Sequence, residues 1–277
     1  MAWGERNGMR IVDQSLGLEG HAVFSCELFE PGCEPVKSSY ALQSEHVVRV
    51  FVNGELVMNL TCSPDHIVEL VVGRLYTEGM IAGVDEVDEV WLCEHSSRVL
   101  VYLRNCQAVA VSKGRMVQDV GTCCTDNRTL SSLFLRDEEL PQVKAIPWSA
   151  EDVFALARAF EGDTPMHRRT FGAHSCYLAR GCKVLYCCED LGRHNAFDKV
   201  VGCALRDGVD LRECTVFTSG RVPTDMAVKA VRARIPIMVS KAVPTDLAVQ
   251  MAAEHGLTLI CSAHSDSFMV MNDPLTK

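Results

Sequence analysis

Hydrophobic positions in the carboxyl-terminal half of the chain follow a pattern of strand, polar turn and helix that repeats. Residues 184–188 form a short unbroken apolar run, which is typical of a strand covered on both faces. Residues 197–205 carry apolar side chains at three- and four-residue spacing, which indicates one face of a helix. Runs at 214–218, 235–239 and 257–261 predict further strands, the first two followed by helices. This alternation indicates a parallel or mostly parallel sheet with helices on its faces.

A polar cluster follows each of these predicted strands. In sheets of this kind the ligand crevice lies beyond the carboxyl ends of the strands, and the helix starts there present N–H groups to anions. We therefore predict a crevice for a phosphorylated or nucleotide-like ligand, to which Arg193 and His194 add positive charge. Taken singly, each cluster is more typical of a helix cap or a solvated charge, but three clusters in a row on one predicted edge favour a binding site. The residues expected to meet there are Arg193, His194, Ser219, Gly220, Arg221, Ser240 and Lys241.

The front half is expected to be α+β, because its strands cluster instead of alternating with helices. Residues 46–52 and 55–60 flank Asn53 and Gly54, a pair typical of a type I′ hairpin turn. Ser63, Pro64 and Asp65 predict the start of a helix. Further strands are predicted at residues 87–92, 99–103 and 108–111.

A domain boundary is predicted between residues 130 and 149, a stretch that contains Pro141, Pro147 and four consecutive charged residues. Just after it, Ser149 and Asp152 form a predicted capping box at the start of a helix. We therefore expect a smaller α+β domain at residues 1–140 and an α/β domain at residues 141–277.

Composition narrows the functional classes. The chain has 277 residues, of which 48% are hydrophobic and 23% charged, as in soluble globular proteins. The formal net charge of -9 argues against a nucleic-acid surface, since duplex binding depends on neutralising phosphates. No apolar segment approaches a signal peptide or the roughly 18 residues of a membrane span. We expect a cytoplasmic protein that binds neither nucleic acid nor membrane.

Fourteen cysteines are many for this length, and without an export signal they are expected to be reduced. No C-x-x-C pair occurs, so no structural zinc site is expected. Most of the cysteines lie in or beside apolar runs, where a thiol packs as a small hydrophobic group. These are Cys62, Cys106, Cys182, Cys187, Cys188, Cys203, Cys214 and Cys261.

Cys123 and Cys124 differ from these, because they lie among turn-forming and polar residues between the two halves. An accessible thiol near a cation such as Arg128 can ionise to the thiolate and accept sulfur as a persulfide. The alternative is a chance pairing in a cysteine-rich chain, and the residues alone leave both interpretations open.

Several motifs resemble those of the FdhD family, the formate dehydrogenase accessory sulfurtransferases. The run EDLGRHNAFDK at residues 189–199 is the most specific of them, and the resemblance covers most of the chain. The other matching stretches are residues 52–54, 61–65, 69–70, 76–81, 219–221, 235–240 and 242–249.

The resemblance implies a carrier that accepts persulfide sulfur from a cysteine desulfurase. It would deliver this sulfur to the molybdenum or tungsten bis-guanine-dinucleotide cofactor, a bound client, before that cofactor enters formate dehydrogenase. It also implies a homodimer whose carboxyl-terminal half is a cytidine-deaminase-like three-layer α/β core without the deaminase zinc or any structural metal. By position, Cys123 is the first candidate for the persulfide cysteine, with Cys124 as a resolving thiol or as the carrier itself.

The resemblance also assigns the cofactor-binding residues. They are Gly172, His174, Gly192, Arg193, His194, Asn195, Asp198, Lys199, Ser219, Gly220, Arg221, Ser240, Cys261, Ser262, Ala263, His264, Ser265 and Asp266. Three positions depart from the family pattern. The two loop cysteines are adjacent instead of separated by two residues, Phe171 replaces a glycine, and His264 stands where the family tends to carry an arginine.

The sequence leaves two other functions to consider. A cofactor chaperone that binds the guanine dinucleotide without moving sulfur would account for the unusual adjacent cysteines. A zinc-dependent deaminase on the same core is disfavoured, because the chain lacks the H-x-E and P-C-x-x-C ligand pattern.

Overall fold

The computed structural model describes residues 2–6, 8–105, 118–120, 140–162 and 164–276. Within them, the front half forms a seven-stranded sheet in the order β1-β2-β7-β8-β5-β6-β9. The strands are β1 (Ala2–Arg6), β2 (Met9–Asp13), β5 (His46–Val52), β6 (Glu55–Cys62), β7 (Val87–Leu92), β8 (Arg98–Leu103) and β9 (Gln118–Val120). Helix α1 (Ile67–Thr77) shares one apolar core with strands β2, β5, β6, β7 and β8.

The back half forms a six-stranded sheet in the order β11-β10-β12-β13-β14-β15 within the described ranges. Its strands are β10 (His174–Arg180), β11 (Lys183–Asp190), β12 (Thr215–Thr218), β13 (Ile237–Ser240), β14 (Thr258–Cys261) and β15 (Met269–Asn272). Its helices are α3 (Ala150–Gly162), α4 (Pro165–Thr170), α5 (Arg193–Asp207), α6 (Thr224–Arg232) and α7 (Asp246–His255). Short 3-10 turns occupy Val84–Glu86, Leu211–Glu213 and Pro274–Thr276.

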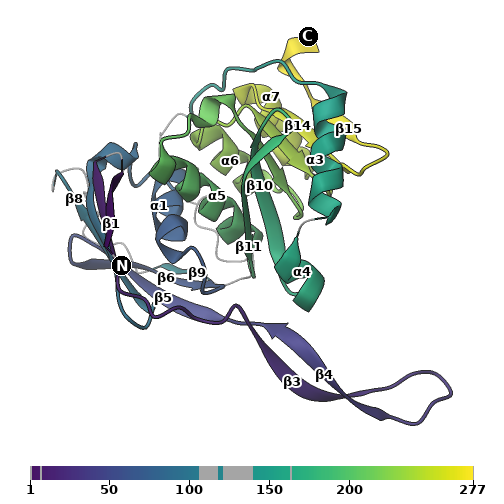
Figure 1. Ribbon diagram of the computed structural model, residues 1–277. Helices are drawn as coiled ribbons and strands as arrows, with labels where there is room; N and C mark the ends of the chain where they lie inside the picture. Colours follow the sequence, from purple (N-terminus) through teal and green to yellow (C-terminus); the bar gives the residue numbers. More distant parts are fainter. Residues whose placement is uncertain (1, 7, 106–117, 121–139, 163, 277) are drawn as a thin grey trace.

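Helices cover both faces of the back sheet, so this half has three layers (Figure 1). Helices α5, α6 and α7 pack on one face, with Phe197, Met226 and Ala248 in that core. Helix α3 covers the other face, where Phe160 packs on Tyr177 and Phe217 at centroid distances of 4.8 and 4.6 Å. The α/β class expected for this half is confirmed.

The sheet is less uniformly parallel than the repeating pattern predicts. Strands β12, β13 and β14 are parallel, but the unpredicted strand β10 lies between β11 and β12 and is antiparallel to both. Strand β15 pairs antiparallel with β14. Two antiparallel steps restore the original direction, so β11 still runs the same way as β12. The carboxyl ends of β11 to β14 therefore share one edge.

In the front half, turn residues, helix-start residues and apolar runs in the sequence predict strands β5 to β8 and helix α1. Asn53, in a left-handed conformation with φ 49°, and Gly54 join β5 to β6 as predicted. Helix α1 begins at Ile67, later than residues 63–65 predict, and its cap residue His66 has φ 51°. The hydroxyl of Ser63 accepts a hydrogen bond from Gln43 and the carboxylate of Asp65 accepts one from Lys199, so both side chains are engaged away from the helix start. Residues 108–111 lie outside the described residues.

An unpredicted hairpin, β3 (His21–Leu28) and β4 (Val36–Gln43), projects from the body of the molecule (Figure 1). Its apolar side chains are largely exposed, with Phe24 at 55% and Phe29 at 70%. Near its base, Gln43 accepts a hydrogen bond from Thr170 at 3.2 Å. No helix among the described residues is long and apolar enough to cross a membrane.

The two halves meet where helix α1 crosses helix α5 (Figure 1). Gly73 of α1 and Gly202 of α5 allow the close approach: a Cβ atom on Gly73 would lie 1.9 Å from the carbonyl oxygen of Asp198. One on Gly202 would lie 1.9 Å from the carbonyl oxygen of Glu69. The two backbones are in direct contact at this crossing, which holds the back-half edge in a defined position relative to the front half.

Candidate functional site

The predicted polar turns do meet at the carboxyl edge of the back sheet. Ser219, after β12, accepts a hydrogen bond from the backbone N–H of Ser175 at 3.0 Å, and its Oγ lies 3.2 Å from Nδ1 of His174. Ser240, at the end of β13, donates to the carbonyl oxygen of Gly220 at 2.7 Å. These bonds connect three neighbouring strand ends, so the serines fix the backbone that lines this edge.

The loop after β14 joins the same edge. The backbone N–H of Ser262 donates to Ala242 at 2.9 Å, and that of Ala263 donates to Ser240 at 3.0 Å. The side chains of Cys261 and Ala263 are buried, so they shape the loop from inside. His264 lies 4.0 Å from Glu161 on α3. Arg221 and Asp266 are exposed, and Lys241 and Ser265 are half-buried.

Arg193 occupies the first position of helix α5, after the cap residue Gly192. Its side chain lies against Gly220, where an added Cβ would come within 2.8 Å of the Arg193 Cδ. Asn195 supports this turn by donating to Asp190 at 2.9 Å and to the carbonyl of Thr61 at 2.8 Å. The guanidinium group of Arg193 and the positive end of the α5 dipole therefore lie at the strand-end edge.

The two histidines of this edge carry no charge at neutral pH. Burial and the nearby cations, first Lys229, then Arg74 and Arg193, lower the pKa of His194 well below 6.5. The imidazole lies 3.4 Å from Asp225. Burial, followed by the charge of Arg193, also lowers the pKa of His174. The expectation that His194 adds positive charge is therefore wrong, and the positive charge of the α5 turn comes from Arg193.

Asp198 and Lys199 lie at the junction of the two halves. Lys199 is fully buried and contacts Asp190 at 2.8 Å and Asp65 at 2.9 Å. Burial alone would lower its pKa, but these two carboxylates outweigh that effect and raise the pKa above its ordinary value. Both side chains are closed off from a ligand in this conformation, so they position the site and do not line it.

Asp198 forms the second part of this junction. It accepts hydrogen bonds from Lys229 at 2.6 Å and from Thr77 at 2.7 Å, and Arg74 lies at 3.4 Å. Sequence reasoning missed Arg74, Thr77 and Lys229, because nothing in their spacing marks them. A buried charged residue in an otherwise apolar helix face is the signal that could have identified Lys229.

The family pattern has a glycine where this chain has Phe171, and the backbone conformation at this position accounts for that glycine. Phe171 ends helix α4 in a left-handed conformation with φ 53° and is 70% exposed. That conformation favours glycine, the residue the pattern would place here. Gly172 follows it and is exposed, whereas His174 enters β10 beside Ser219. Cys123 and Cys124 lie outside the described residues.

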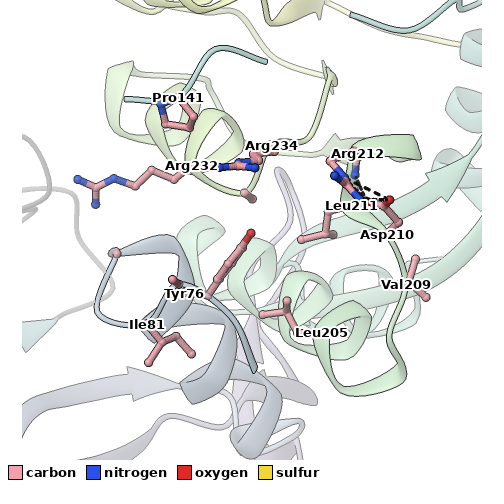
Figure 2. Close-up of a pocket in the computed structure, with 13 residues that line it drawn as sticks. Tyr76, Ile81, Pro141, Leu205, Val209, Asp210, Leu211, Arg212, Arg232 and Arg234 are labelled. Atoms are coloured by element: carbon pink, nitrogen blue, oxygen red, sulfur yellow. Dashed lines mark hydrogen bonds and ion pairs between the residues drawn. The ribbon is translucent and has the colours of Figure 1, made fainter. Parts of the chain in front are cut away.

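A separate cavity of about 610 Å³ opens at the opposite, amino-terminal edge of the back sheet (Figure 2). It lies among the ends of helices α1, α5 and α6, and Arg212, Arg232 and Arg234 are on its wall. Arg212 is paired with Asp210 at 2.8 Å. Tyr76 points into the cavity, and burial raises the pKa of its hydroxyl group. None of the predicted binding residues lines this cavity.

Comparisons with known proteins agree with the resemblance. A model of the FdhD/NarQ family matches residues 43–275. The chain is 30% identical over 246 residues to the sulfur carrier protein FdhD of Listeria innocua, covering 87% of this chain and 93% of the relative. It is 32% identical over 233 residues to the sulfur carrier protein FdhD of Bacillus subtilis, covering 83% and 88%.

A crystal structure described as that of a formate dehydrogenase accessory protein from Desulfotalea psychrophila has the same fold. The TM-score is 0.75 at 23% sequence identity, and the match covers 92% of this chain and 98% of the other. Because the family model spans most of the sequence and relatives reach 30% identity over a similar length, this chain belongs to the FdhD/NarQ family.

Proposed function

We propose that this chain is a sulfur carrier that passes persulfide sulfur from a cysteine desulfurase to the molybdenum or tungsten bis-guanine-dinucleotide cofactor used by formate dehydrogenase. The match to relatives named sulfur carrier protein FdhD over 87% of the chain is the observation that carries this proposal. The solved relative described as a formate dehydrogenase accessory protein supports the choice of client.

The carboxyl edge of the back sheet has the chemistry to bind such a client. A guanine dinucleotide presents a pyrophosphate, and Arg193 stands at a helix start, where a guanidinium and backbone N–H groups favour phosphate oxygens. Gly220 has no Cβ, which leaves room for the Arg193 side chain to pack against it. Ser219 and Ser240 hold the adjoining strand ends.

The sulfur step needs two thiols. In the carrier step the thiolate of Cys123 attacks the outer sulfur of the desulfurase persulfide, a new S–S bond forms, and the desulfurase thiolate leaves. Cys124 then attacks the inner sulfur, so that a disulfide forms and the outer sulfur leaves as hydrosulfide for the client metal. The two thiols supply both electrons for this release, and a cellular dithiol restores them.

The carrier step can be tested with the full-length chain, a cysteine desulfurase and isotopically labelled cysteine. We expect mass spectrometry to find one labelled sulfur on Cys123 or Cys124, and Cys123→Ala and Cys124→Ala to show which thiol holds it. Cys26 and Cys33 are exposed on the projecting hairpin, so a Cys26→Ala, Cys33→Ala variant is the matched control and should keep the label. Absence of label from both loop thiols would overturn the carrier role.

The chaperone alternative rests on the adjacent cysteines. A Cys123→Ala, Cys124→Ala double variant should fail to restore formate dehydrogenase activity in a strain that lacks this protein. Full restoration would instead favour a protein that binds the cofactor without moving sulfur.

The crevice can be tested separately with guanosine diphosphate. We expect Gly220→Val to abolish binding measured by calorimetry, because the new side chain displaces Arg193. Gly162→Ala, at the end of α3 with open space around it, is the matched control and should bind like the parent chain. Equal affinity of both variants would place the nucleotide elsewhere.

We also propose a cytidine-deaminase-like identity for the three-layer back half. The strand order with antiparallel β10 next to β12, and helices on both faces, supports it. Homodimer formation, the desulfurase as partner and a cytoplasmic location are proposed from family membership.

A further inference from the structure

Three side chains with metal-binding atoms meet between the two halves, apart from the residues proposed to bind the dinucleotide. They are His66 at the start of α1, Cys188 on β11 and Cys203 on α5. One ligand atom from each lies within 4.8 Å of the other two, and the two sulfur atoms are 4.0 Å apart. A disulfide has an S–S distance of about 2.05 Å, so both thiols are reduced.

The sulfur separation is close to the edge of a tetrahedral zinc site, and the histidine nitrogen lies within 4.8 Å of both sulfur atoms. With Zn–S near about 2.3 Å and Zn–N near about 2.0 Å, neighbouring ligand atoms are about 3.5 to 3.8 Å apart. The observed sulfur separation exceeds this by only a few tenths of an ångström. Rotation of exposed His66 and a small shift of the two thiols would complete the geometry.

We propose that His66, Cys188 and Cys203 bind a zinc ion. Two thiolates balance the charge of the dication, and imidazole is a neutral ligand that zinc prefers. Three protein ligands leave one tetrahedral position for water or for a thiolate from outside. Because α1 belongs to the front half and β11 and α5 to the back half, the bound ion would tie the halves together.

Two features of His66 support a ligand role. Its backbone is in the left-handed region, φ 51° and ψ 38°, which non-glycine residues occupy rarely and which often marks a functional constraint. Asp65 lies 3.1 Å from its Nδ1, so binding through Nε2 would leave the carboxylate as the orienting partner common to metal-bound histidines.

Of the three proposed ligands, His66 is the one that solvent reaches. His66 is 45% exposed and lines a cavity of about 300 Å³ together with Asp65, Glu69 and Arg206. The two thiols are buried, at 2% and 3% exposure, so a cation held by them and His66 would be shielded from water on the thiol side.

The test uses the full-length Cys123→Ala, Cys124→Ala chain, which removes the thiols of the sulfur carrier from the measurement. After chelation, we expect one equivalent of zinc to bind and to raise the melting temperature. Cobalt added in place of zinc should give thiolate-to-cobalt absorption and the visible bands of a tetrahedral site. Cys188→Ala and Cys203→Ala should lose this absorption, whereas Cys176→Ala, a buried cysteine outside the trio, should keep it.

The His66→Ala variant separates loss of zinc binding from loss of folding, because the His66 side chain is exposed and its removal leaves the core intact. We expect circular dichroism like that of the parent and zinc affinity lower by about a hundredfold. Zinc binding that is absent from the parent, or unchanged in His66→Ala and Cys203→Ala, would overturn the proposal. Neither result bears on persulfide transfer, which is measured at Cys123 and Cys124.

Discussion

Buried charge in this protein gathers where helices α1 and α5 meet. Lys199 and Lys229 are fully buried, and each is paired with carboxylates at 2.6 to 2.9 Å. Removing one member of such a group leaves the other charge buried and uncompensated, which costs more than an average side-chain contact. These residues therefore contribute to the site through the position of the α5 turn.

Asp198→Asn should lower the free energy of unfolding by about 3 to 5 kcal/mol, because Lys229 then loses its nearest charged partner in the interior and keeps only Glu78, at 3.6 Å. Urea denaturation monitored by circular dichroism measures this. The matched control is Asp88→Asn, which breaks an ion pair with Arg104 at the surface and should cost less than about 1 kcal/mol. Equal losses in the two variants would mean that the buried network adds no stability.

His194 makes stability depend on pH. Its folded-state pKa lies below its unfolded value of 6.5, so below that pH the unfolded chain binds more protons. Stability should therefore fall as the pH decreases from 6.5 toward the folded-state pKa. The groups that act on it are Asp225 and Lys229 on α6, Arg74 on α1, Arg193 and His174. Urea midpoints at several pH values should show a smaller loss in His194→Gln, and identical profiles would contradict this.

At the scale of elements, the crossing of α1 and α5 depends on two glycines inside helices. Alanine in place of an interior helical glycine normally stabilises, but here its Cβ would enter the backbone of the opposite helix. In the sequence, these two glycines appear only as residues of low helix propensity within segments that otherwise favour a helix. The contact that requires them is visible only once the two helices are packed.

Gly73→Ala should therefore reduce the free energy of unfolding by at least about 1 to 3 kcal/mol through overpacking. Gly162→Ala, with open space at the end of α3, is the matched control and should be neutral or stabilising by about 0.4 to 1 kcal/mol. Thermal and urea unfolding of both variants measure these changes in the free energy of unfolding. A stabilised Gly73→Ala chain would show that the crossing can relax.

Elements with local signals were predicted well. The Asn53-Gly54 turn defines the β5–β6 hairpin, Gly208 and Gly256 end α5 and α7 in the left-handed conformation, and Thr245 caps α7. Ser149 accepts from the backbone N–H of Asp152, as the predicted capping box requires. Strand β10 was not predicted, although its apolar run at residues 176–179 is a local strand signal; its place between β11 and β12 depends on the tertiary structure.

At the scale of the whole molecule, the projecting hairpin is distinct from both sheets. Its strands pair over eight residues, yet most of their side chains are exposed, so its apolar groups contribute little to either core. This hairpin is not predicted from the sequence. Alternating hydrophobic positions indicate a strand, but they do not show whether another part of the chain covers it.

Replacing residues 24–40 with Asn-Gly should leave the rest of the molecule folded, because Val23 and Ala41 are cross-strand partners that a two-residue turn can join. We expect the free energy of unfolding to change by less than about 1 kcal/mol, since exposed apolar groups gain little on folding. Circular dichroism and urea unfolding measure this. Loss of a cooperative transition would show that the hairpin supports a core.

The polar turns of the predicted site converge as expected, whereas ligand binding by them stays a prediction. The carboxyl edge brings together Arg193, Ser219, Gly220 and Ser240. The strands that precede these residues run in one direction, so the turns that follow the strands lie at the same edge of the sheet. The junction role of Asp198 and Lys199 and the neutrality of His194 depend on groups from distant elements. The same holds for the proposed zinc ligands, which a search for C-x-x-C spacing could not find.

Turns, caps, apolar faces and family motifs were readable in the chain itself, because each depends on residues a few positions apart. Family membership over residues 43–275 follows from such motifs. Which residues face a ligand, which charges are neutralised and which thiols meet a histidine depend on burial and on neighbours more than one hundred residues away. Electrostatic free energies change with local solvation and distance, and folding sets both.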